Sequence, residues 1–207
     1  SLYRKNKEFA TAGYYKVHLE RYDIDVELTA TERVGLHNYI FPDAEKSRII
    51  IDLGEGSADR PTETYIKKVN DTLFEGHRFS TGWARDQREY FSLIISKPVS
   101  DFIIYDRHKK FKGIERKGDY VKGFLEFSTE KDEKIMVKMG ISTVSSKNAL
   151  ENMMIELPHW DFDRVKKSAE LKWENELAKI KIKTKDKKKK RVFYTAMYHT
   201  MIAPNLY

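Results

Sequence analysis

Hydrophobic and polar residues alternate with a period of two along about the first two-thirds of the chain. Short runs of this kind, rich in β-branched and aromatic side chains, are typical of half-buried strands. Turn-forming residues such as Gly54-Glu55-Gly56 and Asn70-Asp71 separate the runs. Because no helical pattern intervenes, we expect the strands to pair antiparallel, which predicts a β-sandwich over residues 1–143. The predicted strands are 14–20, 24–31, 34–41, 48–53, 63–70, 72–79, 88–96, 102–106, 120–127 and 135–142.

After residue 142 the spacing of apolar residues becomes helical. Ser145 or Ser146 is predicted to cap a first helix, which ends close to Pro158. A second helix is expected to start at Asp161 or Asp163, with one continuous apolar stripe: Phe162, Val165, Ala169, Trp173, Leu177 and Ile180. Both helices fall within residues 144–186, the segment that the family resemblance described below implies is a helical linker. Residues 187–207 then carry a last helix, which Pro204 stops.

The charge and composition exclude several classes of protein. The 207 residues carry a net charge of +7 and no cysteine, so there is no disulfide framework and no thiolate zinc site. No run approaches the roughly 20 apolar residues of a membrane span. Much of the basic excess lies within residues 179–191, and no helix-turn-helix, zinc-finger or RNP-like pattern accompanies it. We therefore interpret it as a solvated surface and predict no nucleic-acid partner.

The acidic residues do not form a convincing catalytic or metal-binding pattern. Asp161 and Asp163 lie two residues apart at a helix start, where capping is the expected role. Asp23, Asp25 and Glu27 share one face of a predicted strand and are expected to be solvated. No spacing of His, Asp and Glu forms a metal motif, so we predict neither a metal site nor a catalytic residue within this chain.

A series of short motifs in order resembles the exo-acting α-mannosidases of glycoside hydrolase family 92. The match runs from about residue 13 to residue 207. Its clearest pieces are Val26-Glu27-Leu28-Thr29-Ala30-Thr31, Ile49-Ile50-Ile51-Asp52-Leu53, Gly82-Trp83-Ala84, Gly140-Ile141-Ser142, Trp160-Asp161-Phe162-Asp163, Phe193-Tyr194-Thr195-Ala196, Tyr198-His199-Thr200 and Pro204-Asn205.

The resemblance implies a two-part enzyme, with this sandwich and linker placed before a catalytic (α/α)6 barrel. Residues 187–207 would form the first barrel helix. The family inverts anomeric configuration and needs calcium, and both catalytic carboxylates and the calcium site belong to the barrel. We therefore expect this chain to be an inactive fragment of an α-1,2-type mannosidase, whose partners are the rest of its own polypeptide and mannose-containing glycans. The resemblance also implies a periplasmic or extracellular location in a bacterium.

Three residues are candidates to lie near substrate. Trp83 follows a glycine in a predicted turn, where its indole could stack on a sugar ring; the alternative is an aromatic that plugs the end of the sandwich core. His199 and Asn205 match the family's entry into the barrel, and the alternative for His199 is a core residue of the first barrel helix.

Two other interpretations remain open at this stage. A stand-alone carbohydrate-binding sandwich would bind mannosides without a barrel. A structural interaction domain would use the exposed faces of its last helices, although an uncovered apolar stripe usually indicates a missing partner. The basic run before the last helix departs from the acidic stretch of the relatives, but it costs little because it lies in solvent.

Overall fold

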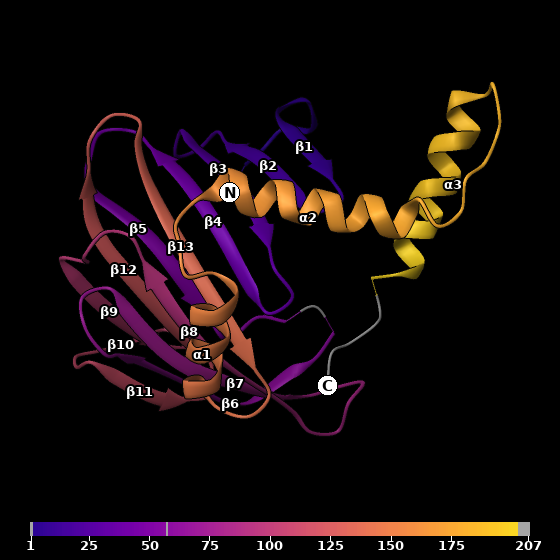
Figure 1. Ribbon diagram of the computed structural model, residues 1–207. Coiled ribbons are helices and arrows are strands. Elements are labelled where there is room, and N and C mark those ends of the chain that lie inside the picture. Colours follow the sequence, from indigo (N-terminus) through magenta and orange to yellow (C-terminus); the bar gives the residue numbers. More distant parts are fainter. Residues whose placement is uncertain (1, 57, 203–207) are drawn as a thin grey trace.

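Two antiparallel sheets and three helices make up the computed structural model, which describes residues 2–56 and 58–202 (Figure 1). A short 3-10 helix, Lys5–Lys7, precedes the first strand. The nine-stranded sheet has the order β1 (Glu8–Thr11), β2 (Tyr14–Leu19), β3 (Ile24–Ala30), β4 (Val34–Phe41), β13 (Glu133–Ser142), β8 (Gln87–Ile95), β7 (Leu73–Thr81), β6 (Arg60–Lys68) and β11 (Glu115–Gly118). The four-stranded sheet has the order β10 (Lys109–Phe111), β9 (Asp101–Asp106), β12 (Val121–Thr129) and β5 (Ala44–Asp52).

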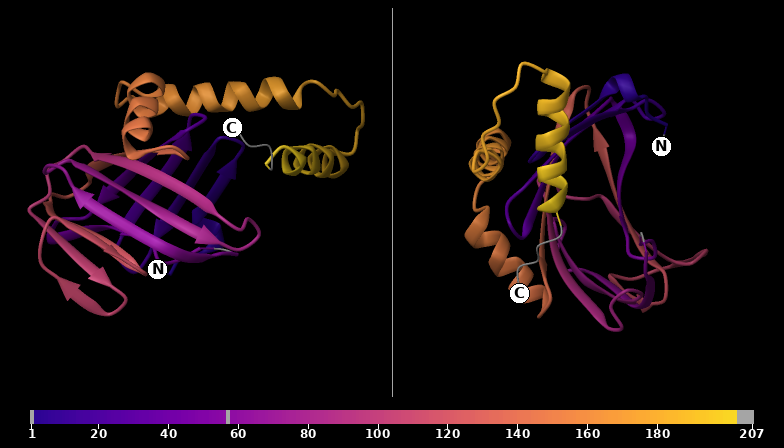
Figure 2. Two further views of the ribbon diagram at one scale, coloured as in Figure 1. Left: turned by 90° about the horizontal axis from the view of Figure 1, so that it is seen from below. Right: turned by 90° about the vertical axis from the view of Figure 1, so that its right-hand side faces the viewer.

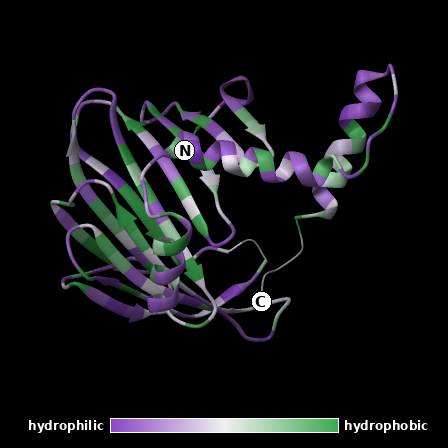
Figure 3. Ribbon diagram, in the orientation of Figure 1, coloured by the Kyte–Doolittle hydropathy of each residue, from purple (hydrophilic) through white to green (hydrophobic). Residues whose placement is uncertain are grey.

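The main hydrophobic core lies between the two sheets. Alternation along β8 directs Phe91, Leu93 and Ile95 inward, where they are buried with residues of the four-stranded sheet such as Ile104 and Leu125. Figure 3 shows the resulting alternation of apolar and polar positions along the strands. The predicted antiparallel sandwich is therefore confirmed, and its cause is the period of two that the sequence carries.

The helices cover the other face of the nine-stranded sheet. Helix α1 (Ser146–Glu156) places Met153 against Val34 and Leu36 of β4, and Val165 of α2 (Phe162–Leu177) joins this second core. At Gly140 of β13 an added Cβ would lie 2.3 Å from the carbonyl oxygen of Ala149, so only glycine lets α1 approach this strand so closely. The middle of the large sheet is thus buried on both faces.

A buried lysine closes the end of α1. Lys138 of β13 is only 5% exposed, and its ammonium group donates to the carbonyl oxygen of Leu157 at 2.9 Å. The same group lies 4.2 Å from the centre of the Trp160 ring. Burial lowers the pKa of Lys138. The lysine therefore satisfies a carbonyl at the helix C-terminus that has no partner within the helix.

The last two helices extend beyond the sandwich. Figure 2 shows α2 lying along the sandwich and passing its edge, and its right-hand view shows α3 (Lys187–Thr200) running across the direction of α2. Trp173 of α2 and Tyr198 of α3 meet edge to face with ring centres 4.7 Å apart. No residue of α3 is buried. Within the described residues no helix is both long and apolar enough to span a membrane.

Most predicted elements are present, with three strands missed and one helix shortened. Strands β1, β10 and β11 were not predicted; each has three or four residues, too few to show a period. Helix α2 ends at Leu177, so Ile180 lies beyond it and is exposed, and only Val165 and Ala169 of the predicted stripe are buried. The two predicted caps are confirmed at Ser145 and Asp161. Pro204 lies outside the described residues.

Candidate functional site

Two neighbouring loops at one end of the sandwich carry the first candidate residue. One loop joins β5 to β6 and the other joins β7 to β8. They touch at Gly82, where an added Cβ would lie 2.8 Å from the carbonyl oxygen of Ala58 and 3.0 Å from Cα of Asp59. The amide of Gly82 donates to the carbonyl oxygen of Ala84 at 2.9 Å and so forms the turn that contains Trp83. A side chain at position 82 would force the two loops apart.

The side chain of Trp83 is fully exposed, at 100% of its accessible area. This corrects the alternative interpretation in which the indole plugs the end of the sandwich core. The physical reason is the tight turn after Gly82, which directs the following residue outward. An exposed indole has a large apolar face with no protein contact, which is the form in which aromatic side chains stack on flat ligands.

A partly buried ion pair fixes the β5–β6 loop to strand β7. The guanidinium of Arg78 on β7 contacts the carboxylate of Asp59 twice, with Nη1 to Oδ2 at 2.5 Å and Nη2 to Oδ1 at 3.1 Å. Its Nε also donates to the carbonyl oxygen of Leu53 at 3.1 Å. Hydrogen bonding from Arg78 lowers the pKa of Asp59 to about 2. The aspartate therefore stays ionised and acts as a clamp for the loops.

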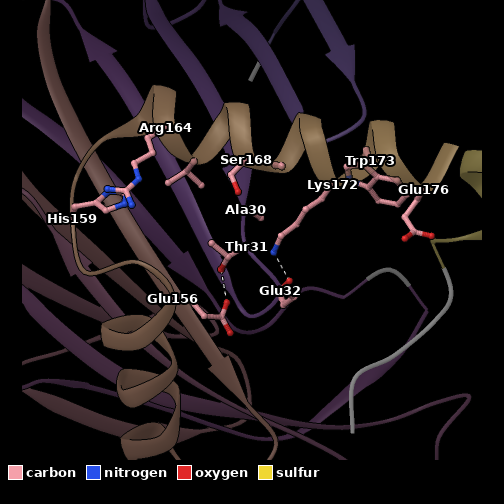
Figure 4. Close-up of a pocket in the computed structure, with 12 residues that line it drawn as sticks. Ala30, Thr31, Glu32, Glu156, His159, Arg164, Ser168, Lys172, Trp173 and Glu176 are labelled. Carbon is pink, nitrogen blue, oxygen red and sulfur yellow. Dashed lines mark hydrogen bonds and ion pairs between the residues drawn. The ribbon is translucent and has the colours of Figure 1, made fainter. Parts of the chain in front are cut away.

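A hollow of about 370 Å³ lies between α2 and the turn that joins β3 to β4 (Figure 4). Its best-connected residue is Glu156, at the end of α1. The Glu156 carboxylate accepts hydrogen bonds from the Thr31 hydroxyl at 2.5 Å, from the Arg33 backbone amide at 3.0 Å and from Arg33 Nε at 2.6 Å. Burial alone would raise the pKa of Glu156, but these hydrogen bonds outweigh it and the pKa lies below its ordinary value.

The other glutamates around this hollow are also paired. Glu32 contacts Lys172 at 2.5 Å, and Glu176 contacts Lys179. In both pairs the carboxylate faces a lysine and not a second carboxylate. The hollow therefore joins the helices to the sheet through ion pairs and does not present an acid and a base facing each other.

The other acidic residues of the sequence analysis have structural roles. Asp161 caps α2, with its carboxylate accepting from the Arg164 amide at 3.0 Å. Asp25 contacts His18 at 3.0 Å. Glu27 was expected to be solvated, which is wrong: it is half-buried and accepts from the Tyr14 hydroxyl at 2.5 Å. The reason is that α2 covers this face of β3, and a sheet alone would leave it open.

Of the other two candidates, only His199 lies within the described residues. His199 lies in the last turn of α3 and is exposed, and Asn205 lies outside the described residues. The loop that carries Trp83 and helix α3 both extend beyond the right-hand side of the sandwich in Figure 1. Both interpretations of His199 depend on a further domain, so they stay predictions.

No metal site is formed by the described residues. Among residues 2–56 and 58–202, no group of three or more His, Cys, Asp or Glu side chains lies close enough to hold an ion. These residues therefore do not fit the calcium ion that the family resemblance implies. The Arg78–Asp59 clamp was missed by the sequence analysis, since its partners are 19 residues apart in sequence and belong to no motif.

The sequence also matches known proteins. Residues 1–142 match the model of the glycosyl hydrolase family 92 N-terminal domain, and residues 148–207 match that of the family 92 catalytic domain. A curated relative from Arthroderma benhamiae, an uncharacterized secreted glycosidase, is 25% identical over 96% of this chain and 29% of its own length.

Solved structures show the same architecture. A family GH92 α-mannosidase from Bacteroides thetaiotaomicron has a TM-score of 0.93 and 28% identity, with 100% of this chain and 29% of that chain covered. The structure of this bacterial α-mannosidase has also been solved in complex with mannoimidazole. An inverting GH92 mannosidase of that bacterium has a TM-score of 0.86 at 21% identity, with 98% of this chain and 27% of that chain covered. The chain thus spans less than a third of these relatives, and it belongs to glycosyl hydrolase family 92.

Proposed function

We propose that this chain is the N-terminal sandwich and helical linker of an exo-acting, inverting α-mannosidase of α-1,2 type. Its role is to support a catalytic (α/α)6 barrel and to line part of the substrate cleft. Family membership supports the first part of the role. Exposed apolar residues in and beside the last helices support the presence of the catalytic domain, because such side chains are normally covered: Ile180 after α2, Val192 within α3 and Ile202 after α3.

The single observation that carries the proposal is the presentation of Trp83. The indole is fully exposed, yet Gly82 packs its loop closely against Ala58 and Asp59 of the β5–β6 loop, which the Arg78–Asp59 pair fixes to β7. A platform for a sugar ring needs both properties, because a mobile aromatic would lose conformational entropy on binding. His199 and Asn205 are proposed to approach the same cleft from the start of the barrel.

The chemistry is assigned to the rest of the polypeptide. An inverting hydrolase needs two carboxyl groups about 6.5–9.5 Å apart, one as acid and one as base for the attacking water. The glutamates around the hollow beside α2 are ion-paired, so we derive no proton transfer from them. Calcium is likewise proposed for the remaining domain, and no step is routed through it here.

The proposed substrates are mannose-containing glycans outside the cytoplasm. The Bacteroides thetaiotaomicron relative is named an α-mannosidase, and the Arthroderma benhamiae relative is described as secreted. We therefore propose that the whole protein is exported to the periplasm or the cell exterior.

The first experiment measures mannose release from α-linked mannobioses, with calcium and with a chelator. The full-length protein should release mannose, and the 207-residue chain at high concentration should not. Release by the isolated chain would place catalytic carboxylates among these residues and overturn the division between the two parts. Binding of mannobiose by the isolated chain, without turnover by either protein, would instead favour a carbohydrate-binding module.

The second experiment tests the indole in the full-length protein. Trp83→Ala should weaken substrate binding by about 1–3 kcal/mol, the range for losing an aromatic contact, and Trp83→Phe should recover part of the loss. Tyr3→Ala is the matched control, because it removes another exposed aromatic side chain that is distant from Trp83 in the sequence. Equal kinetics for Trp83→Ala and the wild type would remove Trp83 from the cleft.

A further inference from the structure

The net positive charge of this chain arises from one short segment. Residues 179–191 contain eight lysines, one arginine and one aspartate, a net charge of +8. The whole chain has 39 basic and 32 acidic residues, so the other 194 residues carry 30 basic and 31 acidic side chains, a net charge of −1. We refer to residues 179–191 as the basic segment. If the excess lysines were spread at random over the surface, the rest of the molecule would also carry a net positive charge.

The basic segment protrudes from the rest of the molecule. It covers the connection between α2 and α3 and the first turns of α3, on the side away from the sandwich (Figures 1 and 3). Within the connection Lys179, Lys181, Lys183 and Lys185 alternate with other residues, and all nine cationic side chains of the segment are exposed. The Tyr194 hydroxyl donates to the carbonyl oxygen of Ile180 at 3.0 Å, which holds the connection against α3.

Little of this charge is neutralised by acidic neighbours. In the described part of the chain, ion pairs within 4.0 Å involve two of the nine cations, Lys179 with Glu176 and Lys189 with Asp186. Asp186 also caps α3, accepting from the amides of Lys188 and Lys189 at 2.9 and 3.0 Å. The five cations that follow this cap oppose the helix dipole. The dipole therefore gains nothing from these charges, so stability of α3 does not explain why they cluster there.

We propose that the basic segment binds an anionic polysaccharide and holds the enzyme on glycan-rich surfaces. A dense, exposed row of lysines attracts polyanions through long-range electrostatics and release of their counterions. A polysaccharide is the favoured polyanion because the chain belongs to a family of glycosidases and a relative is described as secreted. The proposal rests on the charge distribution and the family, and it does not require mannosidase turnover.

The test measures binding of the full-length protein to dextran sulfate, with uncharged dextran as the comparison. The variant replaces Lys187, Lys188, Lys189 and Lys190 by Gln, which keeps helix propensity and leaves the Asp186 cap intact. The matched control replaces four exposed lysines elsewhere by Gln: Lys109, Lys110, Lys112 and Lys131. Both variants lose four charges, and their circular dichroism should match that of the wild type.

We expect binding to dextran sulfate but not to dextran, weakened steeply between 0.05 and 0.5 M salt because screening shortens the range of the interaction (roughly 10 Å at 0.1 M). The Lys187–Lys190 variant should bind roughly tenfold or more weakly, and the control should change by less than about threefold.

Equal losses in the two variants would overturn the proposal. So would absence of binding, as expected if an acidic surface of the catalytic domain covers the segment. Preferential binding to vesicles that contain 30% phosphatidylserine, with none to dextran sulfate, would replace the glycan by a membrane.

Discussion

The clamp between Asp59 and Arg78 gives the most direct test of how the candidate site is built. Replacing Asp59 by Ala removes both contacts to the Arg78 guanidinium and leaves that cation only 14% exposed without its anionic partner. The β5–β6 loop then loses its link to β7, and the turn that carries Trp83 loses the support of the loop beside it. We expect the sandwich core to persist, because neither residue belongs to it.

The size of the effect follows from the pKa of the aspartate. Folding lowers the pKa of Asp59 from 3.8 to about 2, and each unit corresponds to about 1.4 kcal/mol, which sets an upper value of about 2.5 kcal/mol. The carboxylate is 18% exposed, so solvent screening reduces the contribution to about 1–2 kcal/mol. Because the folded pKa is the lower one, this stabilisation is complete above about pH 4. It is lost as the pH falls toward 2.

Hydrogen exchange of the full-length protein at pH 7 is the appropriate assay, because it measures opening of each loop separately. Peptides that cover residues 53–59 and 82–86 should exchange roughly 5- to 30-fold faster in Asp59→Ala. Asp86→Ala is the matched control, because Asp86 lies in the loop that carries Trp83 and forms an exposed ion pair with Arg88 of β8. The side chains of Asp86 and Arg88 are 63% and 58% exposed. If both variants exchange alike, the Asp59–Arg78 pair does not hold the Trp83 loop and the reasoning fails.

Three further substitutions test the contacts between α1 and the sheet, each followed by urea or thermal unfolding of the chain. Met153→Ala, at a fully buried position, should cost about 2–5 kcal/mol, and a cost below about 1 kcal/mol would mean that this core is loosely packed. Gly140→Ala should destabilise by more than about 1 kcal/mol because the new methyl group meets the carbonyl of Ala149; a neutral result would show that α1 can move away. Ser145→Ala should cost about 1 kcal/mol through loss of the cap to the Asn148 amide, and retention of full stability would show that water replaces the cap.

The sandwich was predictable because its strands carry one strong local signal. In β4 the predicted and observed ends coincide at Val34 and Phe41, and buried and half-buried residues alternate from Val34 to Tyr39. The helix caps were predictable for a similar reason. Ser145 and Asp161 precede apolar residues at helical spacing, and each side chain accepts from the amide three residues later.

The remaining features depend on contacts that no local pattern encodes. Strands β10 and β11 exist because longer neighbours offer them hydrogen bonds, as when Glu115 and Gly118 at the two ends of β11 pair with β6. The Asp59–Arg78 clamp requires the β5–β6 loop to fold back onto strand β7. Exposure of Trp83 was left open by the sequence, since a glycine turn at the end of a sandwich can direct an aromatic inward or outward.

The two parts of the proposed cleft are held in physically different ways. The loop of Trp83 is anchored to a sheet whose central strands are buried on both faces, between the two-sheet core and the packing of Met153 and Val165. Helix α3, which carries His199, buries none of its own residues and meets α2 mainly through Trp173 and Tyr198. Elements with little buried area open most easily, so α3 gains its position from whatever packs against it, whereas the indole is positioned before any other domain is present. In the proposed cleft the sandwich would therefore supply the fixed wall, and the catalytic domain would supply the side that is ordered by assembly.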